Sequence, residues 1–180
     1  MRFEDLLGDE RLWAVVYDGD EENVLTQLFS HWTDLDYLYA FFEKNWDDLT
    51  AYFDITDINQ AVSDTGQDAM SLKAVLLDIR PDANLDMVFR PLDNQRIHEM
   101  ILSAEKAKGR RRSGHDSWLR IYALKFEPNA YLITGGAIKL THLMEDREHT
   151  RHELLNLEFV RRTLLEEGVV DLEGFKDLKS

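Results

Sequence analysis

The sequence predicts an α+β fold in which a small antiparallel sheet packs against helices, with extra helices in the N-terminal part. Two observations lead to this class. Apolar and polar residues alternate in two neighbouring segments between residues 117 and 140, which is typical of paired strands. Several other segments repeat apolar residues every three or four positions, as helices with one buried face do. A length of 180 residues, 44% of them hydrophobic, suits a single domain over residues 1–180.

The N-terminal part, about residues 1–84, is predicted to hold one strand and several helices. Residues 12–17 are apolar and rich in β-branched and aromatic side chains, which favours a strand. Residues 35–53 place one apolar stripe along a single helix. Residues 58–64 and 68–79 predict two shorter helices, the second ended by a proline.

The C-terminal part, about residues 85–168, begins with residues 85–92, where a proline in an apolar run predicts an edge strand or a loop. Residues 117–126 alternate strictly, so that Trp118, Arg120 and Tyr122 are expected on one face together with Leu124 and Phe126. Residues 131–140 predict the partner strand of a hairpin. Its Gly135-Gly136 pair predicts a bulge or a place where another backbone or a ligand comes close.

The last long element is predicted as a helix over about residues 151–167. Thr150-x-x-Glu153 matches a capping box at its start, and Gly168 stands where a helix-ending glycine is common. The tail that follows carries several apolar residues, so we expect it to dock on the domain.

Charge is distributed unevenly along the chain. The formal net charge is −14, which by itself argues against general nucleic-acid binding. Residues 1–100 hold 22 acidic and 7 basic residues, a net of −15, whereas residues 101–140 hold 3 acidic and 8 basic residues, a net of +5. An acidic body therefore carries one basic stretch.

Cysteine is absent, which excludes thiol catalysis, Cys-ligated zinc and iron–sulfur clusters and fits a reducing compartment. The first residues contain early acids and no apolar signal segment, and no apolar run approaches the roughly 18 residues of a membrane helix. We expect a cytoplasmic protein with no membrane partner.

Three segments carry a resemblance to known proteins: Ser117-Trp-Leu-Arg-Ile-Tyr-Ala-Leu-Lys125, Tyr131-Leu-Ile-Thr-Gly-Gly-Ala-Ile-Lys-Leu-Thr141 and Arg147-Glu-His-Thr-x-x-Glu153. They resemble the strand-strand-helix ending of a group of uncharacterised bacterial proteins. Beyond that group, the ending is similar to RelE/HigB-type toxins of toxin-antitoxin pairs. The matching pieces, over about residues 88–167, are Arg90-Pro91-Leu92, Leu119-Arg120, Gly136-Ala137-Ile138-Lys139, Thr141 and the helix from Thr150. This chain is longer and more acidic than those toxins, and their second-strand lysine pair is reduced to Lys139-Leu140.

The resemblance implies a RelE/ParE-like sheet and metal-free cleavage of mRNA on the ribosome, with no cofactor. It also implies a partner, an antitoxin with a helix-turn-helix domain. Cleavage needs cations to stabilise phosphoryl charge and groups that move protons. The predicted catalytic residues are Arg120, Lys139, His115 and Tyr122. The predicted nucleic-acid-binding residues are Lys106, Lys108, Arg110, Arg111 and Arg112, taken as a mobile basic loop, together with Trp118 as a stacking surface.

Each of these assignments has a structural alternative. The face of residues 118 to 126 can instead be core, which is the more common role of such a face, with Arg120 salt-bridged at its edge. His115 can be a solvated loop residue, and Lys139 can snorkel from a strand end. The basic stretch can bind the acidic body or an acidic partner. His149-x-x-His152 invites a metal reading, but the capping box would put His149 outside the helix, so we predict no metal site.

The sequence thus favours the toxin half of a toxin-antitoxin pair, acting on ribosomes and mRNA. The alternative is a non-enzymatic interaction module on the same fold, whose acidic surface binds a basic partner or mimics nucleic acid.

Overall fold

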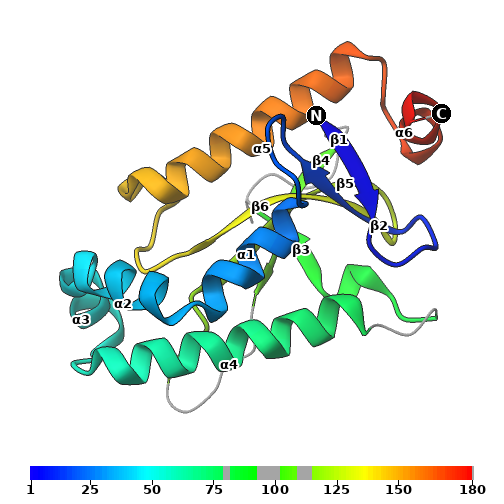
Figure 1. Cartoon of the computed structure of the whole chain (residues 1–180). Helices are drawn as coiled ribbons and strands as arrows, with labels where there is room; N and C mark the ends of the chain where they lie inside the picture. The colour runs from blue at the N-terminus through cyan, green and yellow to red at the C-terminus, as the bar shows by residue number, and fades with distance from the viewer. Residues whose placement is uncertain (79–81, 93–101, 109–114, 180) are drawn as a thin grey trace.

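The computed structural model describes residues 1–78, 82–92, 102–108 and 115–179. Within these residues six strands form one sheet in the order β1-β2-β6-β5-β4-β3 (Figure 1). The strands are β1 (Arg2–Asp5), β2 (Leu12–Val16), β3 (Phe89–Pro91), β4 (Ser103–Lys108), β5 (Leu119–Glu127) and β6 (Ala130–Ile138). The helices are α1 (Val24–Thr33), α2 (Leu35–Lys44), α3 (Trp46–Phe53), α4 (Ile58–Leu77), α5 (Glu148–Glu166) and α6 (Leu172–Lys179), with short 3-10 turns at Leu85–Met87 and Met144–Asp146.

Helices cover both faces of the sheet, so the fold is α+β as predicted. Helices α1 to α4 pack on one face, where Trp32, Phe42, Leu72 and Trp118 belong to the larger core. Helices α5 and α6 pack on the other face, over a second core that includes Trp13, Tyr122 and Phe175. Strands from the N-terminal and C-terminal parts join in the one sheet.

The sheet is antiparallel except at one pair. Strands β4, β5 and β6 form the antiparallel series, and the 119–127 and 130–138 strands confirm the predicted hairpin. Strand β2, however, runs parallel to β6, with Leu12 opposite Tyr131. The prediction of an antiparallel sheet is therefore confirmed for four of the five described strand pairs and was wrong for β2–β6. Helices α1 to α4 and three strands intervene between the two, and only such a long crossover permits a parallel neighbour.

The predicted 35–53 helix is interrupted at Asn45, which separates α2 from α3. Asn45 leaves helical geometry at φ −112° and ψ 27°, and its side-chain amide donates to Phe41 O at 2.8 Å. A short amide side chain that competes for the helix carbonyls disfavours helix continuation. The two predicted helices between 58 and 79 are instead one, α4, because Gly66 is tolerated inside it while Thr65 and Ala69 pack in the core.

Helix α5 begins at Glu148, before the predicted capping box. Thr150 is buried within its first turn, and its hydroxyl donates to Met144 O and Arg147 O. The capping-box interpretation was therefore wrong, and Glu153 is left to point at the sheet. The predicted end is confirmed, since Gly168 follows α5 with φ +82°.

The edges of the fold agree with the sequence. The proline-containing segment forms β3, a short edge strand. The tail docks through α6, whose Phe175 is fully buried against Phe3, Trp13 and Phe126. None of the helices in the described ranges is long and apolar enough to span a bilayer.

Candidate functional site

Basic side chains gather on the α5 face of the sheet, at the end toward β3 and β4. The strand register places Arg90 opposite Lys106, and Lys108 opposite Arg120. Arg120 in turn lies opposite Ala137 of β6, and Lys139 follows two residues later. We call Arg90, Lys106, Lys108, Arg120 and Lys139 the basic cluster. It brings together side chains from three strands and from the end of a fourth.

Mutual repulsion and burial lower the pKa values within the basic cluster. Arg120 and then burial lower the pKa of Lys108, whereas burial and then Arg120 lower the pKa of Lys139. Burial is the main cause that lowers the pKa of the Arg120 guanidinium. Among the described residues, no carboxylate lies within ion-pair distance of Lys108, Arg120 or Lys139.

Main-chain carbonyls, not carboxylates, hold two of these cations in place. Arg120 Nη1 donates to Ser117 O at 2.6 Å and to Leu119 O at 2.8 Å. Lys139 Nζ donates to His142 O at 2.6 Å. Carbonyl oxygens orient a cation without neutralising it, so the cluster keeps its positive charge. Such a cluster can bind an anion that carries several oxygens, such as a phosphate.

His115 does not join the basic cluster. Its ring stacks on Trp118 at 4.4 Å, on the face covered by α1 to α4, and its Nε2 lies 3.1 Å from Asp64 Oδ2. Only about 10% of its side chain is exposed. The solvated-loop alternative for His115 was wrong, because His115 packs in the interface between α4 and the start of β5.

Trp118 and Tyr122 are core residues. Trp118 is fully buried on the face opposite to Tyr122, and its Nε1 donates to Thr65 Oγ1 at 2.9 Å. The predicted shared face was wrong for Trp118, because it precedes β5 and leaves the alternation of that strand. Tyr122 shares the face of Arg120 but is 1% exposed. Neither ring is accessible for stacking on a base, so the core interpretation of these two residues holds.

The predicted basic loop divides into two parts. Lys106 and Lys108 belong to β4, where Lys106 Nζ donates to Leu92 O at 2.9 Å. Arg110, Arg111 and Arg112 lie outside the described residues. The first two cations therefore stand on a rigid strand of the sheet.

A second group of polar residues lies along an open edge of β6. Strand β2 pairs with β6 only from Tyr131 to Ile133. Beyond that point three side chains bond to the β6 backbone where a strand would otherwise pair. Tyr17 donates to Thr134 O at 2.6 Å, His149 Nε2 lies 2.9 Å from Ile138 O, and Glu153 accepts from Gly136 N at 3.0 Å.

Glu153 is the most perturbed carboxyl group of this edge. Burial raises its pKa from 4.5 to about 7, although the Gly136 N–H opposes the shift. Its nearest possible cation is the exposed His152, at 3.9 Å. The Glu153 charge contributes in turn to raising the pKa values of Tyr17, Tyr37 and Tyr122, each of which is raised mainly by burial. A carboxyl group with such a pKa in a pocket is a common mark of a functional site.

Glu153 lines a pocket of about 260 Å³ between α1, α2, β6 and α5, which we call the edge pocket. Its floor includes buried Trp32, Gly136 and Ile138, and its exposed rim includes His31, Tyr37 and Lys44. One wall is a row of rings, in which His31 stacks on Tyr37 at 4.8 Å and Tyr37 on Phe41 at 6.4 Å. The edge pocket thus combines aromatic surface with hydrogen-bonding groups of both kinds.

The contacts at the open edge of β6 explain why Gly135 and Gly136 are glycines. Thr134 is the extra residue of a β-bulge, since Tyr122 faces Gly135 while Ala123 faces Ile133. A Cβ on Gly135 would overlap Glu153 Oε2, and a Cβ on Gly136 would lie 2.6 Å from Arg120 O. Both predicted alternatives, a bulge and a close approach, are therefore confirmed. In the sequence, this glycine pair was the signal that could have indicated Glu153. The role of Glu153 at the β6 edge was not predicted.

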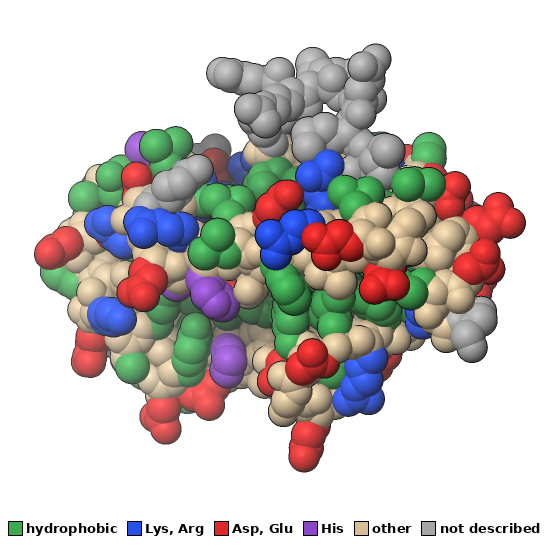
Figure 2. Space-filling model, turned by 90° about the horizontal axis from the view of Figure 1, so that it is seen from above, with side chains coloured by type: hydrophobic (Ala, Val, Ile, Leu, Met, Phe, Trp, Pro, Cys, Tyr) green, Lys and Arg blue, Asp and Glu red, His purple; other side chains and the backbone are tan. Residues whose placement is uncertain are grey.

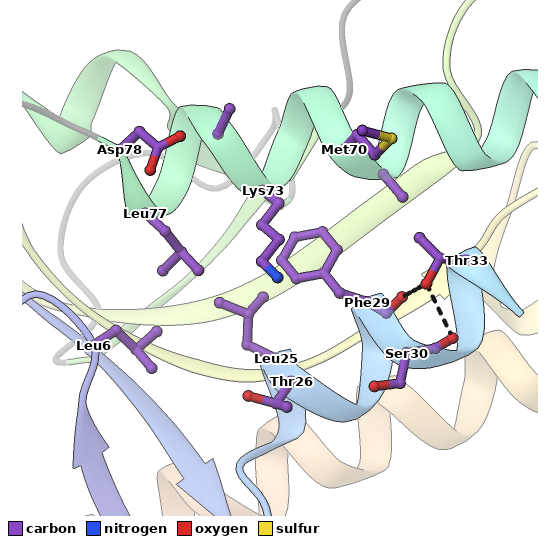
Figure 3. Close-up of a pocket in the computed structure, with 12 residues that line it drawn as sticks. Leu6, Leu25, Thr26, Phe29, Ser30, Thr33, Met70, Lys73, Leu77 and Asp78 are labelled. Carbon is purple, nitrogen blue, oxygen red and sulfur yellow. Dashed lines mark hydrogen bonds between the residues drawn. The ribbon is translucent and has the colours of Figure 1, made fainter.

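A larger groove of about 570 Å³ runs between α1 and α4 (Figure 3). Leu6, Leu25, Phe29 and Leu77 give it an apolar lining, and Lys73 Nζ lies 5.9 Å from the centre of the Phe29 ring. A third cavity, of about 650 Å³, lies between β1, α5 and α6. Figure 2 shows acidic side chains along the outline of the molecule, around a hollow bordered by hydrophobic ones.

His149 and His152, which were considered as metal ligands, do not point to a common position. His149 bonds to β6, whereas His152 is exposed. Both lie inside α5, contrary to the predicted position of His149 outside the helix. In the described ranges no group of three or more potential ligands could hold a metal ion.

The fold and these two sites define the class of the protein: an α+β protein with a mixed six-stranded sheet between two helical layers, a cluster of basic side chains on one sheet face and a separate small polar pocket. Comparison with protein families, curated proteins and solved structures finds no match to this chain.

Proposed function

We propose that the protein binds single-stranded RNA through the basic cluster and acts as the toxin of a toxin-antitoxin pair, a ribosome-dependent endoribonuclease. One observation carries the proposal. A chain with a net charge of −14 collects five cations on one sheet face, and no described carboxylate pairs with Lys108, Arg120 or Lys139. Gathering like charges costs free energy, and bound phosphates offset that cost.

The proposed role of each cation follows from its exposure. Arg90 and Lys108 are exposed and hold the phosphates of the strand. Arg120 and Lys139 are partly buried and oriented by carbonyls, so they stabilise the charge on the phosphoryl oxygens as the 2′-oxygen bonds to phosphorus and the bond to the 5′-oxygen breaks. Solvent water takes the 2′-hydroxyl proton and gives a proton to the leaving 5′-oxygen, so the products are a 2′,3′-cyclic phosphate and a 5′-hydroxyl. His115 and Tyr122 take no part in this proposal, because His115 lies on the other face and Tyr122 is buried. The proposed partners are the ribosome, mRNA and a helix-turn-helix antitoxin.

Measuring RNA affinity at increasing salt concentrations tests whether the basic cluster binds RNA electrostatically. A plot of log affinity against log salt concentration should have a negative slope, which becomes shallower by about 0.7 for each phosphate contact removed. Arg90→Ala and Lys108→Ala should each reduce the slope by about that amount. Arg162→Ala on the exposed side of α5 is the matched control and should leave it unchanged. RNA binding that is equal in all three variants would refute the proposed surface.

Expression of the chain alone in a bacterium tests the activity. Growth arrest with cut transcripts on ribosomes is expected, and Arg120→Ala and Lys139→Ala should relieve it. The unfolding midpoint of each variant separates lost chemistry from lost folding, because Arg120 also bonds to Ser117 O and Leu119 O. Harmless expression with intact transcripts would refute the nuclease function.

A second candidate is a non-enzymatic interaction module, and the α1–α4 groove favours it. Met70 on its border is 69% exposed, and residues 1–100 carry a net charge of −15. An exposed apolar groove on an acidic surface suits a basic amphipathic partner segment. Met70→Lys should then weaken capture of the basic partner segment, because it adds repulsion at the groove border, while leaving RNA affinity unchanged.

A further inference from the structure

The edge pocket offers an unmatched set of hydrogen-bonding groups. One Glu153 oxygen accepts from Gly136 N, and the other lies 3.9 Å from the exposed His152. No described Lys or Arg lies within ion-pair distance of Glu153. Only about 17% of its side chain is exposed, so its carboxyl group is largely withdrawn from water. A buried carboxyl group of this kind is best satisfied by donors that a ligand brings.

Donors line the other sides of the same pocket. Lys44 comes from the end of α2 and His31 from α1, and Asn45 adds a side-chain amide that already donates one N–H to Phe41 O. These groups disfavour a ligand that is wholly cationic, such as a guanidinium, because it would meet Lys44 as well as Glu153. A neutral ligand with donors on one edge and acceptors on another satisfies both sides.

Aromatic rings determine the shape of such a ligand. The stacked rings of His31, Tyr37 and Phe41 form one wall, and Phe41 also meets the edge of His149 at 5.3 Å. Trp32 and Ile138 form an apolar floor. A flat aromatic ring fits this lining, since it can pack against the ring edges of the wall and the apolar floor while its polar edges meet Glu153 and the rim.

From these features we infer that the edge pocket binds a guanine base, with Glu153 as the acceptor for its N1–H and 2-amino donors. Guanine carries two neighbouring donors that match one carboxylate, and its O6 and N7 are acceptors for the rim donors. Adenine and the pyrimidines lack this pair of neighbouring donors next to an acceptor edge. The pocket would take the base from a free nucleotide or from an RNA strand. The inference is independent of the proposed RNA cleavage, because base recognition involves none of the five cations of the basic cluster.

Titration of the full chain with guanosine, which has no phosphate, tests the inference directly. Calorimetry at pH 8, where the Glu153 carboxyl group with its pKa of about 7 is mostly ionised, should give saturable one-to-one binding of guanosine. Inosine, which lacks the 2-amino group, should bind about tenfold more weakly, as expected for a loss of about 1.4 kcal/mol from one buried hydrogen bond. Equal affinity for guanosine, inosine and adenosine, or no binding of any of them, would overturn the inference.

Variants locate the site. Glu153→Gln keeps an oxygen for the Gly136 N–H but loses the carboxylate, so guanosine affinity should fall about tenfold or more while the fold is retained. Tyr37→Ala should also weaken binding, because it removes part of the aromatic wall of the pocket. Glu158→Gln on the exposed side of α5 is the matched control. An unchanged affinity in Glu153→Gln, with guanosine still bound, would place the base elsewhere and overturn the inference.

Competition experiments identify the source of the base and test other ligands. GMP and a single-stranded RNA containing one guanosine should both compete with guanosine, and the stronger competitor identifies the source. Arginine amide should not compete, and if it alone binds, the pocket takes a cationic side chain and the inference fails. Guanosine binding with unaltered RNA affinity in Arg90→Ala would refute the proposed function but support the edge pocket.

Discussion

Glu153 takes the place of a missing strand neighbour at the open edge of β6. Its carboxyl group bonds to Gly136 N and occupies the space above Gly135, where any side chain would collide with it. The two glycines and the glutamate are therefore one unit, although 17 residues separate Glu153 from Gly136. Sequence spacing assigned Glu153 to a helix cap because a capping box and an inward-pointing glutamate share the same short pattern.

Gly135→Ala should lower the free energy of unfolding by about 1–3 kcal/mol, the usual cost of overpacking. In a Glu153→Ala background the same change should cost less, because the colliding carboxyl group is gone. Urea unfolding of the four proteins in this cycle measures the coupling. Gly66→Ala is the control, since nothing lies within 4 Å of its Cβ position in α4. It should stabilise by about 0.5–1 kcal/mol. Equal costs of Gly135→Ala in both backgrounds would contradict the proposed contact.

At the scale of elements, α4 is attached to the beginning of β5. Thr65 Oγ1 donates to Ala61 O within α4 and accepts from Trp118 Nε1. Trp118 also meets Phe42 of α2 and Phe53 of α3, so one ring joins three helices to the sheet. The periodicity of α4 was visible in the sequence. Its continuity through Gly66 was not, because it depends on packing against Trp118.

Thr65→Val should lower the free energy of unfolding by about 1–3 kcal/mol, because it leaves the buried Trp118 N–H without an acceptor. Thr163→Val is the matched control. Its hydroxyl makes the same bond to the carbonyl four residues earlier, but on the exposed side of α5. The control should stay within about 0.5 kcal/mol of the wild type. Chemical denaturation measures both, and equal effects would show that the Trp118 bond contributes nothing specific.

At the scale of the whole molecule, the negative net charge and the burial of Glu153 both lower the stability of the folded protein as pH rises. The net charge of −14 produces repulsion among exposed acids. Glu153 adds a local effect, since its pKa is about 7 in the folded protein against 4.5 for a solvated glutamate. The folded state therefore binds its proton more tightly than the unfolded chain does. The stability from this protonation is fully present below about pH 4.5 and is lost as pH rises to about 7.

Glu153→Gln should remove this part of the pH dependence. The difference in free energy of unfolding between wild type and variant should change by about 3 kcal/mol between pH 4 and pH 8, with the wild type losing more. Urea unfolding at several pH values measures it. A difference that stays constant with pH would contradict the raised pKa of Glu153.

The sequence by itself determined the α+β class, the hairpin, the strand at residues 12–16, the edge strand and the docked tail. These follow from local periodicity and turn chemistry, which short stretches of chain express alone. It also located the basic residues, because charge can be counted along a chain. Tertiary structure decided the rest: the parallel β2–β6 pair, the burial of Trp118 and Tyr122, the separation of His115 from Arg120, and the position of Glu153. Each depends on which residues distant in the chain become neighbours, and only the assembled sheet and its two helical layers establish those contacts.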